Sequence, residues 1–199
     1  MTVITTSNGY KYRPLEESDE TFILECLKDY PIGSNTLHQR RNEFANMLYV
    51  TEGFNETKVK NKTSLQSITM VTEKADGTPI GFQHIEIDNL LVELRMGATH
   101  PTHRRQGHST ARLMLLGEFA YNHLGCTGTW LEIVDTNNLN KVADTWRDDI
   151  SANETERTNE NKFGDTQTYT LKKIQITAAE HETHRAGHST WGTVTYTIE

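Results

Sequence analysis

The spacing of apolar side chains changes along the chain, and each change marks a different kind of predicted element. Residues 10–14 read as a short strand that ends at a proline. Two helical patterns follow, at 18–30 and at 37–48, and Ser18 is the expected N-cap of the first. The next segment, 51–64, is polar and is expected to be a mobile loop.

The middle of the chain switches to the period of two that is typical of strands, and later returns to helical spacing. A turn sequence, Ala75-Asp-Gly-Thr78, separates the first two of these strands and predicts a β-hairpin. The expected elements are strands at 65–72, 80–87 and 91–99, a helix that ends near Gly125, a strand at 129–135 and a helix at 136–146.

The last part of the chain is polar and without pattern at 151–165, and then rich in β-forming residues. We expect the runs at 166–177 and 190–199 to pair as a terminal hairpin around a histidine-containing connection. The whole order predicts a mixed α/β layout in one domain. Its expected parts are 1–64 (first strand and two helices), 65–150 (core) and 166–199 (terminal hairpin) within the single domain 1–199.

Composition and charge exclude several classes of function. The chain has 199 residues with 20 basic and 27 acidic side chains, so its net charge of −7 argues against a nucleic-acid partner. No run approaches the roughly 18 apolar residues of a membrane span, and the first residues lack the order of a secretory signal. We therefore expect a cytoplasmic protein, in which the distant Cys26 and Cys126 stay reduced.

The segment Arg104-Arg-Gln-Gly-His-Ser109 joins a predicted central strand to a strong helix and carries the candidate chemistry. A glycine at position 107 lets the backbone approach a ligand closely, and the N–H groups at a helix start face an anion. Arg104 and Arg105 add positive charge at the same point. A pyrophosphate suits this loop, although a tight turn with two solvated arginines is the alternative interpretation.

This loop and the order of elements around it resemble the GNAT superfamily, the Gcn5-related N-acetyltransferases. Arg104-x-x-Gly107-x-Ser109 matches the family's acetyl-CoA loop, Arg/Gln-x-x-Gly-x-Gly/Ala, with serine at the last small position. An Asn-x-x-Ala helix, Asn140 to Ala143, follows the next strand as it does in the family. The resemblance implies an α/β (mixed α+β) fold whose twisted mixed sheet splays between its fourth and fifth strands, flanked by about four helices.

The resemblance also implies acetyl-CoA as co-substrate, no metal, and direct attack of an amine on the thioester. The pantetheine arm would pair with the backbone of one strand, and the diphosphate would rest on loop N–H groups. A backbone N–H near Gly97 or Ala98 would stabilise the oxyanion. The implied binding residues are Met96, Gly97, Ala98, Thr99, Arg104, Arg105, Gln106, Gly107, His108, Ser109, Thr110 and Asn140.

Removal of a proton from the acceptor amine requires a base, and Glu93 is our candidate. It occupies the place on the fourth strand where the histone-acetyltransferase branch of the family has its catalytic glutamate. The alternative is a strand carboxylate that is exposed or pairs with Arg95. Glu86 and Glu132 are weaker substitutes that would act through water.

One departure from the family keeps a second function open. The position of the family's proton-donating tyrosine is Arg147 in this chain. The alternative to an N-acetyltransferase for small or protein amines is therefore a catalytically silent binding or assembly module, such as a virus-encoded structural protein. Its terminal hairpin would join copies into a homo-oligomer.

Nine histidines are many for this length. Three of them, His181, His184 and His188, fall in the last connection and could supply zinc ligands. We favour exposed loop histidines instead, because no clear fourth ligand accompanies them.

Overall fold

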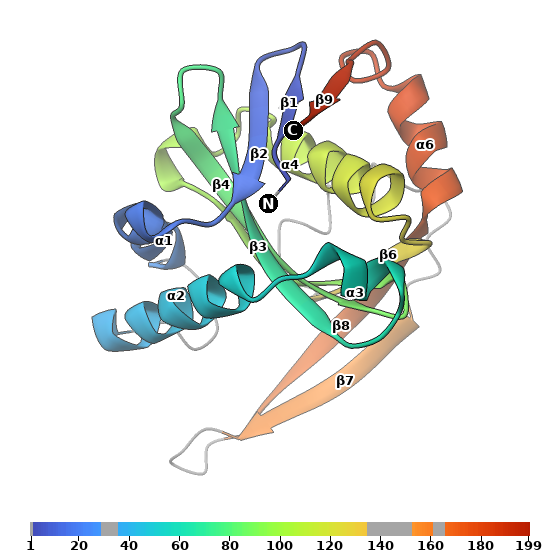
Figure 1. Ribbon diagram of the computed structural model, residues 1–199. Helices are drawn as coiled ribbons and strands as arrows, with labels where there is room; N and C mark the ends of the chain where they lie inside the picture. Colours follow the sequence, from blue (N-terminus) through green and yellow to red (C-terminus); the bar gives the residue numbers. More distant parts are fainter. Residues whose placement is uncertain (1, 29–35, 135–152, 161–165) are drawn as a thin grey trace.

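The computed structural model describes residues 2–28, 36–134, 153–160 and 166–199. Within these ranges nine strands form one sheet in the order β7-β8-β6-β5-β4-β3-β2-β1-β9, with helices on both faces (Figure 1). The strands are β1 (Ile4–Thr6), β2 (Tyr10–Pro14), β3 (Gln66–Lys74), β4 (Pro79–Asp88), β5 (Leu91–Thr99), β6 (Gly128–Val134), β7 (Asn153–Glu160), β8 (Thr166–Thr177) and β9 (Tyr196–Ile198). The helical segments are η1 (Glu17–Asp19), α1 (Glu20–Leu27), α2 (Leu37–Glu52), α3 (Glu56–Lys60), η2 (Pro101–His103), α4 (His108–Gly117), the π-helical η3 (Glu118–His123) and α6 (Ala178–Gly187).

The central strands lie where the sequence pattern predicts them. β3, β4 and β5 form an antiparallel meander, and β5 has the expected bounds. The turn between β3 and β4 forms where Gly77 adopts a φ of 82° and Asp76 accepts a hydrogen bond of 2.9 Å from the Thr78 N–H. The connection from β4 to β5 is a two-residue turn in which Asn89 and Leu90 both have positive φ.

Two apolar layers hold helices against opposite faces of the sheet. On one face, hereafter the α2 face, α1 and α2 pack on Val71 and Phe82. On the other face, hereafter the α4 face, α4 and η3 pack on side chains that point the opposite way from the same strands. These sheet residues are Ile68, Met70, Ile85 and Ile87. β3 and β4 are therefore buried on both sides over most of their length, as expected for the centre of a sheet that helices cover on both faces.

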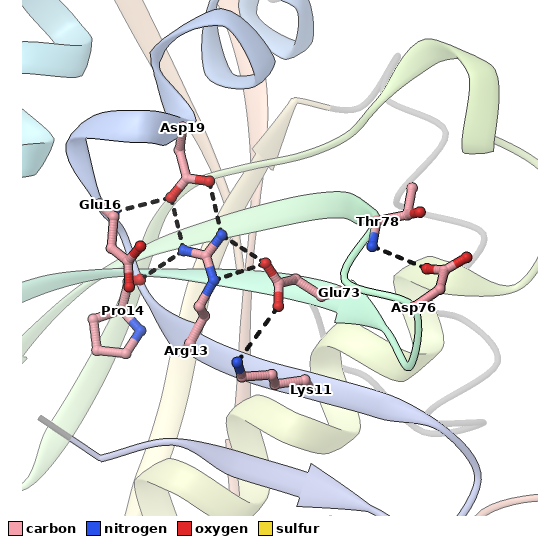
Figure 2. Close-up of polar contacts among 8 residues, drawn as sticks. All are labelled: Lys11, Arg13, Pro14, Glu16, Asp19, Glu73, Asp76 and Thr78. Atoms are coloured by element: carbon pink, nitrogen blue, oxygen red, sulfur yellow. Dashed lines mark hydrogen bonds and ion pairs between the residues drawn. The ribbon is translucent and has the colours of Figure 1, made fainter.

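An arginine whose side chain is 11% exposed ties β2 to β3 and to the start of α1 (Figure 2). The Arg13 guanidinium donates two hydrogen bonds to Asp19, at 2.7 and 2.8 Å, and one of 2.7 Å from Nε to Glu73. These hydrogen bonds raise the pKa of Arg13 further above its already high range. Both carboxylates are about 95% buried, so the guanidinium is the charge that makes their burial tolerable.

The predicted terminal hairpin is wrong. The segment 166–177 is a strand, but β8 pairs with β6 and β7, and the polar segment before it contributes β7. The connection is helix α6, which begins with a capping box between Thr177 and Glu180. β9 then pairs with β1 at the opposite edge of the sheet. The proposed route to a homo-oligomer through a 166–199 hairpin therefore lacks its structural basis.

Three smaller expectations also change. The N-cap of the first helix, α1, is Asp19 and not Ser18, and the 3₁₀ segment η1 before it begins at Glu16 with a capping box to Asp19. The segment expected as a mobile loop holds the end of α2 and the helix α3, whose N-cap is Asn55. His181 is buried in α6 and is not an exposed loop histidine. No helix in the described ranges has the length and apolar character of a membrane span.

Candidate active site

β5 and β6 separate partway along their length. They pair in parallel only where Leu91–Glu93 lies beside Gly128–Trp130. Beyond Glu93, β5 keeps β4 as its neighbour while β6 continues along β8. The fourth and fifth strands of the predicted sheet are β5 and β6 here, so the expected splay is confirmed.

The unpaired half of β5 directs specific backbone groups toward the side it no longer shares with β6. Along an antiparallel strand the backbone N–H groups point alternately to the neighbouring strand on one side and on the other. The His100 N–H donates to the Ile80 carbonyl of β4 at 2.9 Å. By this alternation the Ala98 N–H also points to β4, whereas the N–H groups of Gly97 and Thr99 point to the open side. Of the two expected oxyanion donors, only the Gly97 N–H has the required direction.

A side chain at position 97 would collide with the end of the Gln83 side chain. A Cβ built there would lie 2.3 Å from Gln83 Oε1. The same buried Gln83 amide donates from Nε2 to the Met96 carbonyl at 3.0 Å. It thereby supports β5 at the point where β6 no longer does.

The loop before α4 presents a set of uncommitted N–H groups. Within the described part of the chain, the N–H groups of residues 105 to 109 donate to no carbonyl, and no side chain caps the helix. Arg105 and Gly107 have φ values of 61° and 78°, so the backbone turns twice through the left-handed region. Strain of this kind at Arg105 is typical of ligand-binding loops. Arg104 and Thr110, at the two ends of the expected diphosphate site, differ from these residues, because their N–H groups donate to the carbonyls of Pro101 and Gly107.

The side chains of the loop divide into exposed cations and a buried imidazole. Arg104, Arg105 and Gln106 are exposed, and Arg104 Nε donates to the Thr99 carbonyl at 3.2 Å. His108 is buried, with Nδ1 3.1 Å from the Tyr10 hydroxyl. Burial, helped by Lys74, lowers the pKa of His108, so its contribution at neutral pH is packing under the loop and not charge.

Two carboxylates lie beside the point of splay. Glu86 and Glu93 pair across β4 and β5 on the α2 face, and Trp130 is the next residue in this row. Arg95 Nη1 lies 2.5 Å from Glu93 Oε1, and Arg95 Nε lies 3.8 Å from Glu86 Oε2. Glu93 thus has both expected features, a place next to the open strand edge and a pairing with Arg95.

Some predicted residues are not placed. Asn140 and Arg147 lie outside the described residues, and for Glu132 only the backbone is described, in β6. In the described ranges no three His, Cys, Asp or Glu side chains are grouped to hold a metal ion.

The sequence reasoning missed a β-bulge and a histidine next to it. Arg95 is an extra residue in β5, because Ile85 pairs with Leu94 while the adjacent His84 pairs with Met96. His84 lies on the α2 face of β4, opposite Met96, the residue that follows the bulge. A run that alternates as regularly as 80–87 gives no local signal for either feature.

Comparisons with known proteins address the fold. No protein-family model and no curated protein sequence matches the chain. Among solved structures, a spermidine N-acetyltransferase from Vibrio cholerae in complex with CoA and spermine has a TM-score of 0.57 at 16% identity, covering 87% of this chain and 98% of its own. A single-residue variant of a spermidine N-acetyltransferase from the same organism reaches 0.60, at 16% identity over 87% and 96%.

A third match is the ribosomal-protein-S18-alanine N-acetyltransferase from Escherichia coli, with a TM-score of 0.51 and 16% identity over 84% of this chain and 94% of that one. Identities this low are informative about the fold alone. Together with the splayed strands and the loop before α4, they show that the chain has the fold of the GNAT N-acetyltransferases.

Proposed function

We propose that this protein is an N-acetyltransferase that moves an acetyl group from acetyl-CoA to a primary amine. The observation that carries the proposal is the set of uncommitted N–H groups at residues 105–109, directly beside the unpaired edge of β5. A diphosphate fits these N–H groups because a helix start favours an anion and two exposed arginine side chains belong to the same loop. The extended pantetheine arm of acetyl-CoA, which carries amide groups, fits the unpaired edge of β5. One of the similar structures contains CoA and spermine, which supports this choice of ligands.

The chemistry assigned to the chain is positioning and proton transfer. The Gly97 N–H donates to the thioester oxygen as negative charge develops on it. Glu93 accepts the proton that the amine loses on attack, and Arg95 keeps that carboxylate next to the splay. The acceptor is an amine, small or protein-borne, that approaches from the α2 face.

Binding is tested first, by thermal unfolding with and without acetyl-CoA. A ligand at 100 times its Kd stabilises a protein by about 2.7 kcal/mol, so a clear rise in Tm is expected. Gly107→Val places a β-branched residue at a φ of 78° and should abolish the shift. Gly125→Val is the matched control, because Gly125 has a similar φ of 76°, a Cβ there also meets nothing, and the residue follows η3, beyond the end of α4 away from the loop. Unchanged binding by Gly107→Val would refute the assigned diphosphate site.

Turnover is tested by release of free thiol with a panel of amines that includes spermidine and a peptide with N-terminal alanine. Glu93→Gln should lower kcat by about 10²- to 10⁴-fold while acetyl-CoA still raises the Tm. Glu86→Gln, which removes the other carboxylate near Arg95, should have a much smaller effect. Equal rates for Glu93→Gln and the parent protein would remove Glu93 from the role of base. Acetyl-CoA binding without turnover of any amine would favour the silent module.

A further inference from the structure

A cavity of about 460 Å³ lies between the C-terminal turn of α2 and the start of β3, and it has no part in the chemistry above. Cavities of this size bind a small ligand or one group of a larger one. Tyr49, Val50 and Leu65 give the cavity a mainly apolar wall, and Glu52 and Ser67 are among its polar residues. Its chemistry therefore suits an apolar group.

Two side chains of this wall are unusually exposed for their type. Tyr49 is 78% exposed and Leu65 is 55% exposed, and they are two of the four large apolar side chains that are exposed in the described parts of the chain. A single exposed apolar side chain needs no explanation. Two of them on the wall of one cavity are typical of a surface that binds an apolar group.

A row of side chains across the sheet connects the cavity to the candidate base. Ser67 pairs with Glu86 of β4, and Glu86 pairs with Glu93 of β5. Directly paired residues point to the same face of a sheet, so all three side chains lie on the α2 face. Neighbouring strands are about 4.8 Å apart, which puts Glu93 about 10 Å from Ser67. The Glu86 and Glu93 side chains are 29% and 22% exposed, so a ligand that lies along this row can contact both.

The charges along this row determine which kind of acceptor it favours. Arg95 pairs with both Glu93 and Glu86. A polyamine would bring a second ammonium group next to the Arg95 guanidinium, and like charges repel. Glu52 adds a carboxylate at the far end, but it is exposed, and water and salt screen exposed charges. The row therefore favours an acceptor that is uncharged between its reacting amine and its far end.

We propose that the cavity between α2 and β3 binds an apolar or aromatic group of the acceptor, about 10 Å from the amine that loses its proton to Glu93. This inference rests on the proposed acetyl transfer and names the class of acceptor, a primary amine with an uncharged linker that ends in an apolar group. A phenylalkylamine has this form. A peptide N-terminus with an apolar third residue also has it, because about three extended residues span 10 Å. The cavity contributes to specificity by removing apolar surface of the acceptor from water.

Steady-state kinetics with hexylamine, phenylhexylamine and spermidine test the proposal. Phenylhexylamine should have a kcat/KM about tenfold to hundredfold above that of hexylamine, the usual effect of burying one aromatic ring, and spermidine should be a poorer acceptor than phenylhexylamine. Leu65→Ser removes part of the apolar wall and should lower the phenylhexylamine-to-hexylamine ratio about threefold to tenfold, mainly through KM. Leu37→Ser is the matched control, because Leu37 is an exposed leucine at the other end of α2, and it should keep the parent ratio. The Tm of both variants reports whether they are folded.

The two sources of this chemistry are distinguished by the amidated tripeptides alanyl-alanyl-phenylalanine and alanyl-alanyl-serine. A kcat/KM for the phenylalanine peptide above that of phenylhexylamine would identify a protein acceptor, and the reverse order a small amine.

Equal kcat/KM for hexylamine and phenylhexylamine, a preference for spermidine, or a ratio that Leu65→Ser leaves at the parent value would overturn the apolar subsite while leaving the acetyltransferase in place. A parent protein that acetylates no amine would overturn the proposed function. Calorimetric titration with phenylhexylamine then decides the subsite by itself, and equal affinities of the parent and of Leu65→Ser, or no binding, would overturn it as well.

Discussion

The buried His181 on α6 should make the stability of the protein depend on pH in a way that one substitution removes. Its side chain is about 4% exposed, and its Nε2 lies against α4, where a Cβ on Gly117 would be 2.0 Å away. The Tyr121 ring lies next to it, with centroids 5.2 Å apart. Burial lowers the pKa of His181 from 6.5 to about 4, so the folded state holds the ring neutral.

The sign and size of the effect follow from proton linkage. Below pH 6.5 the unfolded chain binds a proton at this residue and the folded chain does not, so stability is present above pH 6.5 and is lost as pH falls. With the values of 6.5 and about 4, the free energy of unfolding decreases by about 2 kcal/mol between pH 7 and pH 5 on account of this group. His84, with a similarly lowered pKa, adds a loss of the same order.

Urea unfolding of the parent protein and of His181→Leu at pH 7 and pH 5 measures the difference. The substitution changes packing equally at both pH values, so its cost cancels when each protein is compared with itself. We expect the pH-induced loss of stability to be about 2 kcal/mol smaller in the variant. The same loss in both proteins would show that His181 is protonated in the folded state, and the reasoning from burial would fail.

Two further substitutions test packing and charge at other points. Gly117→Ala should destabilise the protein by about 1–3 kcal/mol through collision with the His181 ring, and His181→Ala in the same chain should relieve most of that cost, as judged by urea midpoints. Additive effects would contradict this close approach. Arg13→Met should cost about 3–5 kcal/mol because it leaves two buried carboxylates without their cation, whereas Lys28→Met at an exposed pair should change stability by less than 1 kcal/mol. A small loss for Arg13→Met would mean that water replaces the guanidinium.

The parts of the fold that could be predicted are those encoded by neighbouring residues. The run 91–99 alternates and is bounded by turn residues, so its limits in the structure are the expected ones. The loop was recognisable because a left-handed turn before a helix favours glycine at one position, here Gly107. In both cases the physical requirement falls within a few residues, and the sequence displays it directly.

The prediction for the C-terminal part of the chain was wrong for the opposite reason. Threonine-rich segments favour strands, but which strand each one joins depends on partners more than a hundred residues away, as with β9 and β1. Helix α6 had a local signal in the capping box of Thr177 and Glu180, and the β-rich surroundings outweighed it in the prediction. Pairing over long distances is decided by which apolar surface remains uncovered, and single-sequence patterns do not contain that information.

The bulge at Arg95 explains why the candidate site could be predicted only in part. Without an extra residue, Glu93 and Met96 would point to opposite faces of the sheet, because their separation is odd. The packing shows the switch, since Leu94 contacts the core of the α4 face whereas Met96 and Ala98 contact that of the α2 face. The bulge therefore brings Met96 and Ala98 onto the same face as the candidate base Glu93, beside a strand edge left open for a ligand. A strand with unbroken alternation could turn Glu93 or the pair Met96 and Ala98 toward the α2 face, but not both.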